Sequence, residues 1–371
     1  MSEAATMERA EGEAARSVRP NRFVNASAEH VEPFYDSQQL TPGTTVANVE
    51  VAANGYLAGI LVQVDVTSSG NSATVALQED GPYSILSDVR LSDINGANLF
   101  GPLSGYDWYN ACKYGGYAAH NDGRDHPSYA QSATGTGGTA GTQSFSLRIP
   151  VQINPRDAYG ALPNMNAAST FKFGFSVAAL SAAFATPPNG TVTVRVRASI
   201  ETWLVPQAVD AGSVPNMTTP PGLGTYQRWV KNTFTITSGS NTLRLPNVSN
   251  MIRNLVLIYR ESTPVRDDTD FPDSVELRID GYARDQIRKE EIRTRMWERF
   301  GYQSADLDAG VFVWDWTHEL DGKPGFETRE LWLPTNSATR LEIVGQFADS
   351  GTLDVLTNDV VVAGGDYRQA G

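Results

Sequence analysis

Two short stretches of this chain share one pattern: SDVRLSDING at residues 87–96 and DSVELRIDG at residues 273–281. In both, apolar residues alternate with polar ones, and the run ends in an Asn-Gly or Asp-Gly pair. Alternation with a period of two predicts a half-buried strand, and the terminal pair predicts a tight turn. In both halves, an apolar strand and a loop precede the stretch, and a helix-capable segment follows it. The repeat therefore predicts two copies of one β-rich unit in series.

The apolar strand before the first copy is YLAGILVQVDV, residues 56–66, and its counterpart before the second copy is LVLIY, residues 255–259. The first of these begins as a continuous apolar run and ends in alternation. We expect a long strand that is buried first on both faces and then on one face.

A third strand, residues 192–204, alternates over most of its length, and one face carries Val192, Val194, Val196, Ala198, Ile200 and Thr202. The other face is polar and carries Thr193, Arg195, Arg197, Ser199 and Glu201. We expect the first face to lie in a core and the second to meet water or a neighbouring subunit.

The remaining strands are shorter, and the helices are few. Strands are predicted near residues 46–51, 73–77, 145–153, 171–177, 234–237, 243–245, 311–316, 330–333, 341–347 and 353–362. A helix is predicted over 283–300, where Ile292, Met296 and Phe300 recur every four residues. A shorter helix is expected between residues 99 and 117.

The composition agrees with an all-β fold. The 371 residues include 33 Gly and 20 Pro, while charged residues are only 19%. Gly and Pro serve turns, so this mixture is typical of many short strands joined by loops. We expect two tandem β-sandwiches of roughly eight strands each, a few short helices and an N-terminal arm; the family resemblance given below implies that both are jelly rolls.

Four segments follow from these patterns. Residues 1–44 are predicted to be an N-terminal arm, partly helical, and residues 45–205 a first jelly roll. Residues 206–224 hold four Pro and three Gly and hardly any large apolar side chains, so they are predicted to be a linker. Residues 225–371 are predicted to be a second jelly roll with a C-terminal tail.

Charge and cysteine content limit the possible functions. The formal net charge is −13, which argues against wrapping nucleic acid, because phosphate binding favours a basic face. The single cysteine, Cys112, allows no disulfide within the chain, and we expect it to be a buried or interfacial thiol. No run reaches the roughly 18 apolar residues of a spanning helix, and residues 1–20 lack a signal-peptide core. We expect the chain to be neither exported by the usual route nor embedded in a bilayer.

One pair of carboxylates is a candidate catalytic site. A glycosidase needs two carboxylates about 5–10 Å apart. Asp315 and Glu319 have like parity on a predicted strand, and Trp314, Trp316 and Trp332 are candidates to stack on sugars. Aromatic and charged residues are also common on half-buried strands without catalysis, and this is the interpretation that we favour.

The sequence signals for metal and phosphate sites are equally weak. The acidic loop with Asp267, Asp268, Asp270 and Asp273 is a calcium candidate, but it lacks the EF-hand pattern, so a solvated loop is preferred. The histidines, His30, His120, His126 and His318, show no metal-ligand spacing. No phosphate-binding Gly loop or Ser-His-Asp signature occurs. The sequence therefore predicts no catalytic, cofactor-binding or metal-binding residues and no cofactor, and it predicts that the chain is not an enzyme.

Several stretches resemble one family in their order along the chain. In the first half these are GYLAGILVQV (55–64), ALQEDGPYSIL (76–86) and YDWYN (106–110). In the second half they are LRLPN (243–247), NLVLIYR (254–260) and the passage 293–315. Together they resemble the major capsid proteins of tectiviruses, phages with an internal membrane whose coat subunit is a double jelly roll.

The resemblance implies a homotrimer with a pseudo-hexagonal outline that tiles an icosahedral shell around a membrane and double-stranded DNA. It implies assembly in the host cytoplasm and contacts with neighbouring trimers, penton or spike proteins and minor capsid proteins. The N-terminal arm is then a candidate to contact the membrane, and sequence-specific nucleic-acid binding is not expected. Two alternatives stay open: a phage spike or receptor-binding β-sandwich protein and, less favoured, a carbohydrate-active enzyme.

Overall fold

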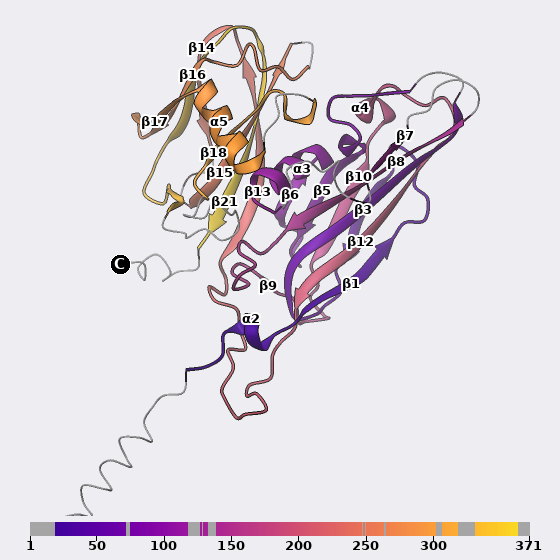
Figure 1. The fold of residues 1–371 in the computed structure, drawn as a ribbon, viewed down its shortest axis with the longest axis vertical. Coiled ribbons are helices and arrows are strands. Elements are labelled where there is room, and N and C mark those ends of the chain that lie inside the picture. Colours follow the sequence, from indigo (N-terminus) through magenta and orange to yellow (C-terminus); the bar gives the residue numbers. More distant parts are fainter. Residues whose placement is uncertain are drawn as a thin grey trace, which may run out of the picture.

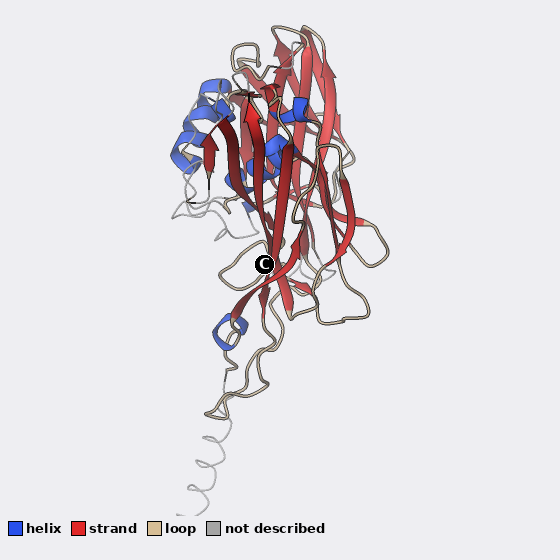
Figure 2. Cartoon of the chain, turned by 90° about the vertical axis from the view of Figure 1, so that its right-hand side faces the viewer, coloured by secondary structure: helices blue, strands red, loops and turns tan. Residues whose placement is uncertain are grey.

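Two β-sandwiches stand side by side, with their strands running roughly along the long axis of the molecule (Figure 1). This arrangement is seen in a computed structural model that describes residues 19–71, 75–117, 127, 129–132, 139–246, 248, 250–262, 265–301, 306–317 and 331–362. Turned by 90°, the molecule shows upright strands, a helix at the left, smaller helical pieces among the strands and a loop extension at the lower end (Figure 2).

The first sandwich has two main sheets. The larger sheet contains β1 (Glu29–Asp36), β3 (Tyr56–Asn71), β7 (Ala130–Ser132), β8 (Thr139–Pro150), β9 (Leu162–Pro163) and β12 (Val192–Trp203). Its order is β1-β12-β3-β8-β7, with β9 also paired to β3. The opposed sheet contains β2 (Thr45–Glu50), β5 (Leu86–Ser92), β6 (Asn98–Leu103) and β10 (Lys172–Val177). Its order is β2-β10-β5-β6. A small separate sheet joins β4 (Ala76–Leu77) to β11 (Phe184–Thr186).

The second sandwich repeats this plan. One sheet contains β13 (Tyr226–Ile236), β15 (Met251–Glu261), β18 (Val311–Asp315), β19 (Leu333–Pro334) and β21 (Gly351–Val361). Its order is β13-β21-β15-β18, with β19 paired to β15. The other contains β14 (Gly239–Leu245), β16 (Ser274–Ile279), β17 (Tyr282–Arg288) and β20 (Leu341–Phe347). Its order is β14-β20-β16-β17.

The two sandwiches are topological equivalents. When the strands are matched in chain order, β1-β12-β3-β8 corresponds to β13-β21-β15-β18, and β2-β10-β5-β6 corresponds to β14-β20-β16-β17. The repeated stretches at 87–96 and 273–281 fall on the equivalent strands β5 and β16. The expected all-β architecture of two tandem sandwiches is confirmed.

Helices are short and lie outside the sheets. They are α2 (Phe23–Ala26), α3 (Gly105–Tyr114), α4 (Leu180–Ala183) and α5 (Lys289–Phe300), with 3₁₀ turns η1 (Tyr83–Ile85) and η3 (Asp306–Asp308). Helix α3 lies between β6 and β8 in the chain, and α5 lies between β17 and β18, so the two helices hold equivalent places. In the part of the chain that the structure describes, no helix is long and apolar enough to cross a membrane.

The strand patterns that the sequence predicts most clearly are confirmed. Residues 56–60 of β3 are all buried, after which burial alternates. On β12, the predicted face is buried from Val192 to Thr202, and its pairing with β3 runs without a break from Val192↔Ser68 to Glu201↔Gly59. Burial of alternate apolar side chains between the two sheets supplies the main driving force for each sandwich.

The first sandwich begins earlier than the expected residue 45. Residues 29–36, inside the range expected for the arm, form β1 and pair antiparallel with β12. This strand is an edge strand with mostly exposed or half-buried residues, and Pro33 lies within it next to a shift in register. Because one of its faces is poorly buried and proline is tolerated at sheet edges, it carries no alternating apolar signal.

The helix expected over 283–300 is also shorter than expected. Residues 282–288 form β17, and the helix begins at Lys289. Ile287 is thus a strand residue that pairs with Val275 of β16. Residues 1–18 of the arm and the tail from residue 363 lie outside the described residues.

Candidate functional site: the interface between the sandwiches

Helix α3 sits between the two sandwiches (Figure 1). It begins with a capping box, in which Ser104 Oγ accepts from the Asp107 amide at 3.1 Å and the Ser104 amide donates to Asp107 Oδ2 at 2.9 Å. Every residue of the helix is buried except Cys112, which is partly buried. A helix buried all round must be covered from two sides, here by its own sandwich and by the second one.

The start of α3 is tied to the second sandwich by a charged pair. Lys231 Nζ of β13 lies 2.7 Å from the buried Asp107 Oδ2. Burial works to lower the pKa of Lys231, but the carboxylates of Asp107 and Asp354 outweigh it, so this pKa lies above its usual value. The same carboxylate therefore caps the helix and holds the neighbouring sandwich.

The end of α3 carries a second pair. Lys113 Nζ lies 2.7 Å from both carboxylate oxygens of Asp308, which belongs to η3 of the second sandwich. Tyr114 Oη donates to Asp308 Oδ1 at 2.9 Å. Burial, followed by the charge of Asp308, holds the pKa of Tyr114 well above its ordinary value, so the phenol stays protonated and donates.

Above α3, two arginines of the second sandwich reach the loop of the first that holds Asp80. Arg260 Nη2 lies 2.8 Å from Asp80 Oδ2, and Arg266 Nε lies 2.9 Å from Asp80 Oδ1. The Arg266 side chain is fully buried and also donates to the carbonyls of Leu307 at 2.9 Å and Ala309 at 2.7 Å. Its guanidinium lies 4.8 Å from the ring centroid of Tyr106. A planar donor fork suits this combination of carboxylate, carbonyl and aromatic partners.

Below α3, Gln227 and Arg253 join the sandwiches. Gln227 Nε2 donates to the carbonyls of Pro150 at 3.1 Å and Gln152 at 2.9 Å. Arg253 Nη1 donates to Tyr117 Oη at 3.0 Å. Gln227 and Arg253 are fully buried. A polar network of this kind fixes one relative position, because any shift leaves buried donors unpaired.

Sequence reasoning did not identify this interface. The signal available was a predicted helix with aromatic residues on every side: Tyr106, Trp108, Tyr109 and Tyr114. A helix with apolar residues all round is a buried helix, and the capping pair Ser104 and Asp107 marks its start.

Asp315, the described member of the candidate glycosidase pair, is engaged in contacts with its neighbours. Asp315, at the end of β18, is ion-paired with Arg299 of α5, and Asp315 Oδ1 accepts from the Thr317 amide at 2.9 Å. Trp314 and Trp332 are buried, so neither ring face is free for a sugar, and Trp316 is half-buried. Glu319 lies outside the described residues.

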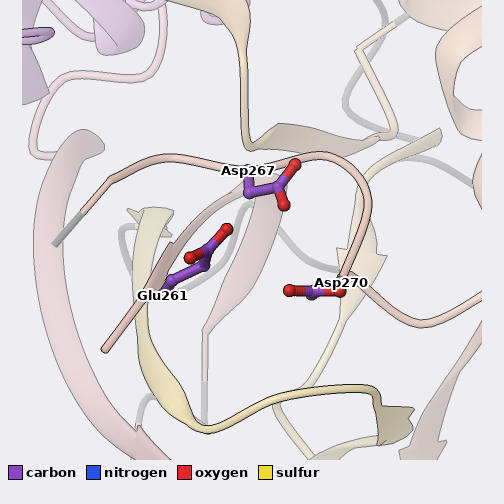
Figure 3. A group of neighbouring side chains, drawn as sticks. All are labelled: Glu261, Asp267 and Asp270. Atoms are coloured by element: carbon purple, nitrogen blue, oxygen red, sulfur yellow. The ribbon is translucent and has the colours of Figure 1, made fainter. Parts of the chain in front are cut away.

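The acidic loop divides between two sets of contacts. Asp268 is ion-paired with Arg293 at 2.7 Å, and Asp273 lies 3.4 Å from Lys289. Asp267 and Asp270 instead gather with Glu261, with carboxylate oxygens within 4.8 Å of one another (Figure 3). Burial works to raise the pKa of Asp267, but hydrogen bonds donated by Thr269 and a proton shared with the Glu261 carboxyl outweigh it and leave this pKa below its usual value. The solvated loop favoured by the sequence stays a prediction, with calcium binding as its alternative.

The remaining candidates from the sequence are Cys112 and the histidines. The Cys112 thiol donates to the Arg148 carbonyl at 2.6 Å, and burial raises its pKa to about 12, so it is a poor nucleophile. His30 lies on β1 beside Glu32 at 3.9 Å. His120, His126 and His318 lie outside the described residues.

The fold has close counterparts among solved structures. No protein-family model and no curated protein matches the sequence. The MCP of STIV, Sulfolobus turreted icosahedral virus, matches with a TM-score of 0.65 at 14% identity, over 93% of this chain and 100% of that one. The VP54 protein of PBCV-1 matches with a TM-score of 0.65 at 13% identity, over 91% and 95%.

The fold is a double jelly roll. The major capsid protein P2 of bacteriophage PM2 is a third match, with a TM-score of 0.55 at 11% identity, over 91% of this chain and 99% of that one. Because the matches extend over both chains almost completely, the likeness includes both jelly rolls and their relative placement.

Proposed function

We propose that this chain is a major capsid protein, the building block of an icosahedral viral shell. The observation that carries the proposal is the match of nearly the whole chain to viral major capsid proteins from STIV, PBCV-1 and PM2. A likeness limited to one sandwich would fit many extracellular or lectin-like proteins, whereas two sandwiches with one relative placement are far more restrictive.

The locked interface around α3 supports a mechanical role. Ion pairs at both ends of the helix and the fully buried Arg266 and Arg253 hold the sandwiches as one block. A shell subunit needs this stiffness, because bending between its two sandwiches would displace the neighbouring subunits of the lattice. Asp315, the one described member of the candidate catalytic pair, is engaged by Arg299, which favours a non-catalytic protein.

Three copies would place six similar sandwiches around an axis and give a trimer with a pseudo-hexagonal outline. Such trimers would pack beside one another and beside different proteins at the five-fold vertices. An internal membrane and a double-stranded DNA genome are proposed on the tectivirus resemblance of the sequence, with the subunit located in the capsid of the virion.

Electron microscopy of the purified protein tests this function. We expect particles with a hexagonal outline that pack into sheets or shells as the concentration rises. Single two-lobed particles at every concentration would overturn the proposal.

A further inference from the structure

A row of three polar side chains crosses the second sandwich beside α3. Trp229 of β13 lies opposite Asn358 of β21, which in turn lies opposite Asn254 of β15. Side chains that are opposite one another on paired strands share a face of the sheet, with Cβ atoms about 4.5–5.5 Å apart. All three side chains are fully buried. The row is therefore one polar strip in a dry part of the molecule.

The two amide groups of the row are held in one orientation. Asn254 Nδ2 donates to the Tyr114 carbonyl at 2.7 Å, and Asn358 Nδ2 donates to Gln227 Oε1 at 2.8 Å. Gln227 is itself fixed, because its Nε2 donates to the Gln152 carbonyl at 2.9 Å. All of these partners accept, so turning either asparagine over would set oxygen against oxygen. The two Oδ1 atoms must therefore find other partners.

One donor and two acceptors of the row need a common partner. Within the part of the chain that the structure describes, Trp229 Nε1, Asn254 Oδ1 and Asn358 Oδ1 are buried without a hydrogen bond. Buried polar groups are hydrogen-bonded in nearly all native proteins, because a group that loses its hydration without compensation is costly. A ligand with both donors and acceptors would satisfy all three atoms.

The three side chains approach the same end of α3. Asn254 reaches the carbonyl of Tyr114, the last residue of the helix. The Trp229 ring atom Cζ2 lies 2.9 Å from the position of a Cβ added to Gly115, the next residue. Cζ2 is bonded to the ring carbon that carries Nε1, so the indole N–H is on this edge of the ring. Asn358 lies between these two strands, and the end of α3 covers the row.

We infer that the row binds a single buried water molecule. The water accepts a hydrogen bond from Trp229 Nε1 and donates one each to Asn254 Oδ1 and Asn358 Oδ1. Its two protons and one of its lone pairs match the two acceptors and one donor of the row. Buried waters typically make about three hydrogen bonds to groups that otherwise have none. This inference does not depend on the proposed capsid function.

A metal ion fits the row less well than water. Sodium and calcium need a shell of oxygen ligands, whereas the Trp229 indole offers only a hydrogen with partial positive charge. The Arg253 guanidinium, whose Nη2 lies 3.4 Å from the Gly115 carbonyl oxygen, adds a full positive charge nearby. Both groups repel a cation, and neither repels a neutral water molecule.

Both sandwiches contribute to the site. The second sandwich supplies the three polar side chains, and α3 of the first covers them. The water can leave only when the two sandwiches separate locally, so its presence would accompany the closed interface. The water would thus be part of the contact that holds the sandwiches in one relative position.

A crystal structure of the full chain at a resolution better than about 2 Å tests the inference. We expect one peak of solvent density at hydrogen-bond distance, about 2.7–3.2 Å, from Trp229 Nε1, Asn254 Oδ1 and Asn358 Oδ1. Empty density beside the row would overturn the inference. So would a direct hydrogen bond from another side chain to either Oδ1 atom, or a peak with the contacts of about 2.3–2.6 Å that calcium makes.

Two variants determine whether the indole N–H holds the water. Trp229→Phe keeps an aromatic ring but removes the donor, so the peak should weaken or vanish. Trp203→Phe is the matched control, because Trp203 Nε1 already donates to Gln152 Oε1 at 2.9 Å and lies outside the row. Its peak should be unchanged. An undiminished peak in Trp229→Phe would overturn the inference, and the unaltered protein alone decides it if that variant does not fold.

Discussion

Lys113 and Asp308 form a buried ion pair across the two sandwiches, with the ammonium nitrogen 2.7 Å from the carboxylate. Only 4% and 7% of these side chains are exposed. The pair joins the end of α3 to η3, residues 195 positions apart in the chain. A shift of one sandwich against the other would break this pair and leave a buried charge without its partner. The pair therefore helps to fix the relative placement of the two sandwiches.

Replacing Lys113 by Met removes the cation and leaves Asp308 buried. Breaking a buried pair from one side costs about 3–5 kcal/mol, so the free energy of unfolding should fall by this amount. The double variant Lys113→Met, Asp308→Leu should recover much of the loss, since neither charge is then left alone. Guanidinium chloride unfolding measures all three proteins.

The control for this prediction is Glu276→Ala. It breaks the surface pair of Glu276 with Arg278, whose side chains are 21% and 37% exposed. Surface pairs contribute about 1 kcal/mol or less. A Lys113→Met variant that is no less stable than this control would contradict the assigned role.

Gly115→Ala tests the packing at the end of α3. A Cβ at Gly115 would lie 2.3 Å from the Ala111 carbonyl oxygen and 2.9 Å from the Trp229 ring of the second sandwich. Overpacking of this kind costs about 1–3 kcal/mol, and thermal unfolding should show the loss. At Gly212 a Cβ would meet nothing closer than 3.4 Å, so Gly212→Ala should be nearly neutral. An equal loss of stability in Gly115→Ala and Gly212→Ala would refute the close approach of Trp229 to Gly115.

Cys112 should resist alkylation in the folded protein. Burial raises the pKa of its thiol from 9.0 to about 12. The folded state is therefore stabilised relative to the unfolded state as long as the thiol stays protonated. This contribution is complete below about pH 9 and is lost as the pH rises toward 12. Iodoacetamide at pH 8, read by mass spectrometry, should modify Cys112 only after guanidinium chloride is added. Rapid modification of the folded protein would show that the thiol is open.

Asp315→Asn separates a structural role from a catalytic one. Asp315 is ion-paired with Arg299 and accepts from Thr317, so the variant should lose about 1–3 kcal/mol of stability. Asp285→Asn, at an exposed pair with Arg284 3.4 Å apart, should lose less. Glycan cleavage by the unaltered protein that disappears in Asp315→Asn would revive the enzyme hypothesis.

Sequence patterns predicted the elements whose burial is one-sided or complete. Strand β12 alternates because one face is core and the other is polar, and this pattern is readable residue by residue. The equivalence of residues 87–96 and 273–281 was readable for the same reason, since β5 and β16 hold corresponding places in their sheets. Local composition decides such elements, so a single sequence suffices.

Elements decided by distant contacts were missed or misplaced. Strand β1 has mostly exposed side chains and contains Pro33, so nothing in its own sequence indicates pairing with β12. Residues 283–288 fall within the helix predicted from the spacing of Ile292, Met296 and Phe300, whereas the pairing of this segment with β16 decides its conformation. The interface depends on partners such as Lys113 and Asp308, which look like surface charges until the fold brings them together.

The molar mass of the purified protein in solution tests the capsid assignment most directly. Sedimentation equilibrium over a wide concentration range should find three chains of 40.2 kDa, about 121 kDa, with larger assemblies at high concentration. A stable monomer of 40.2 kDa throughout would contradict the account.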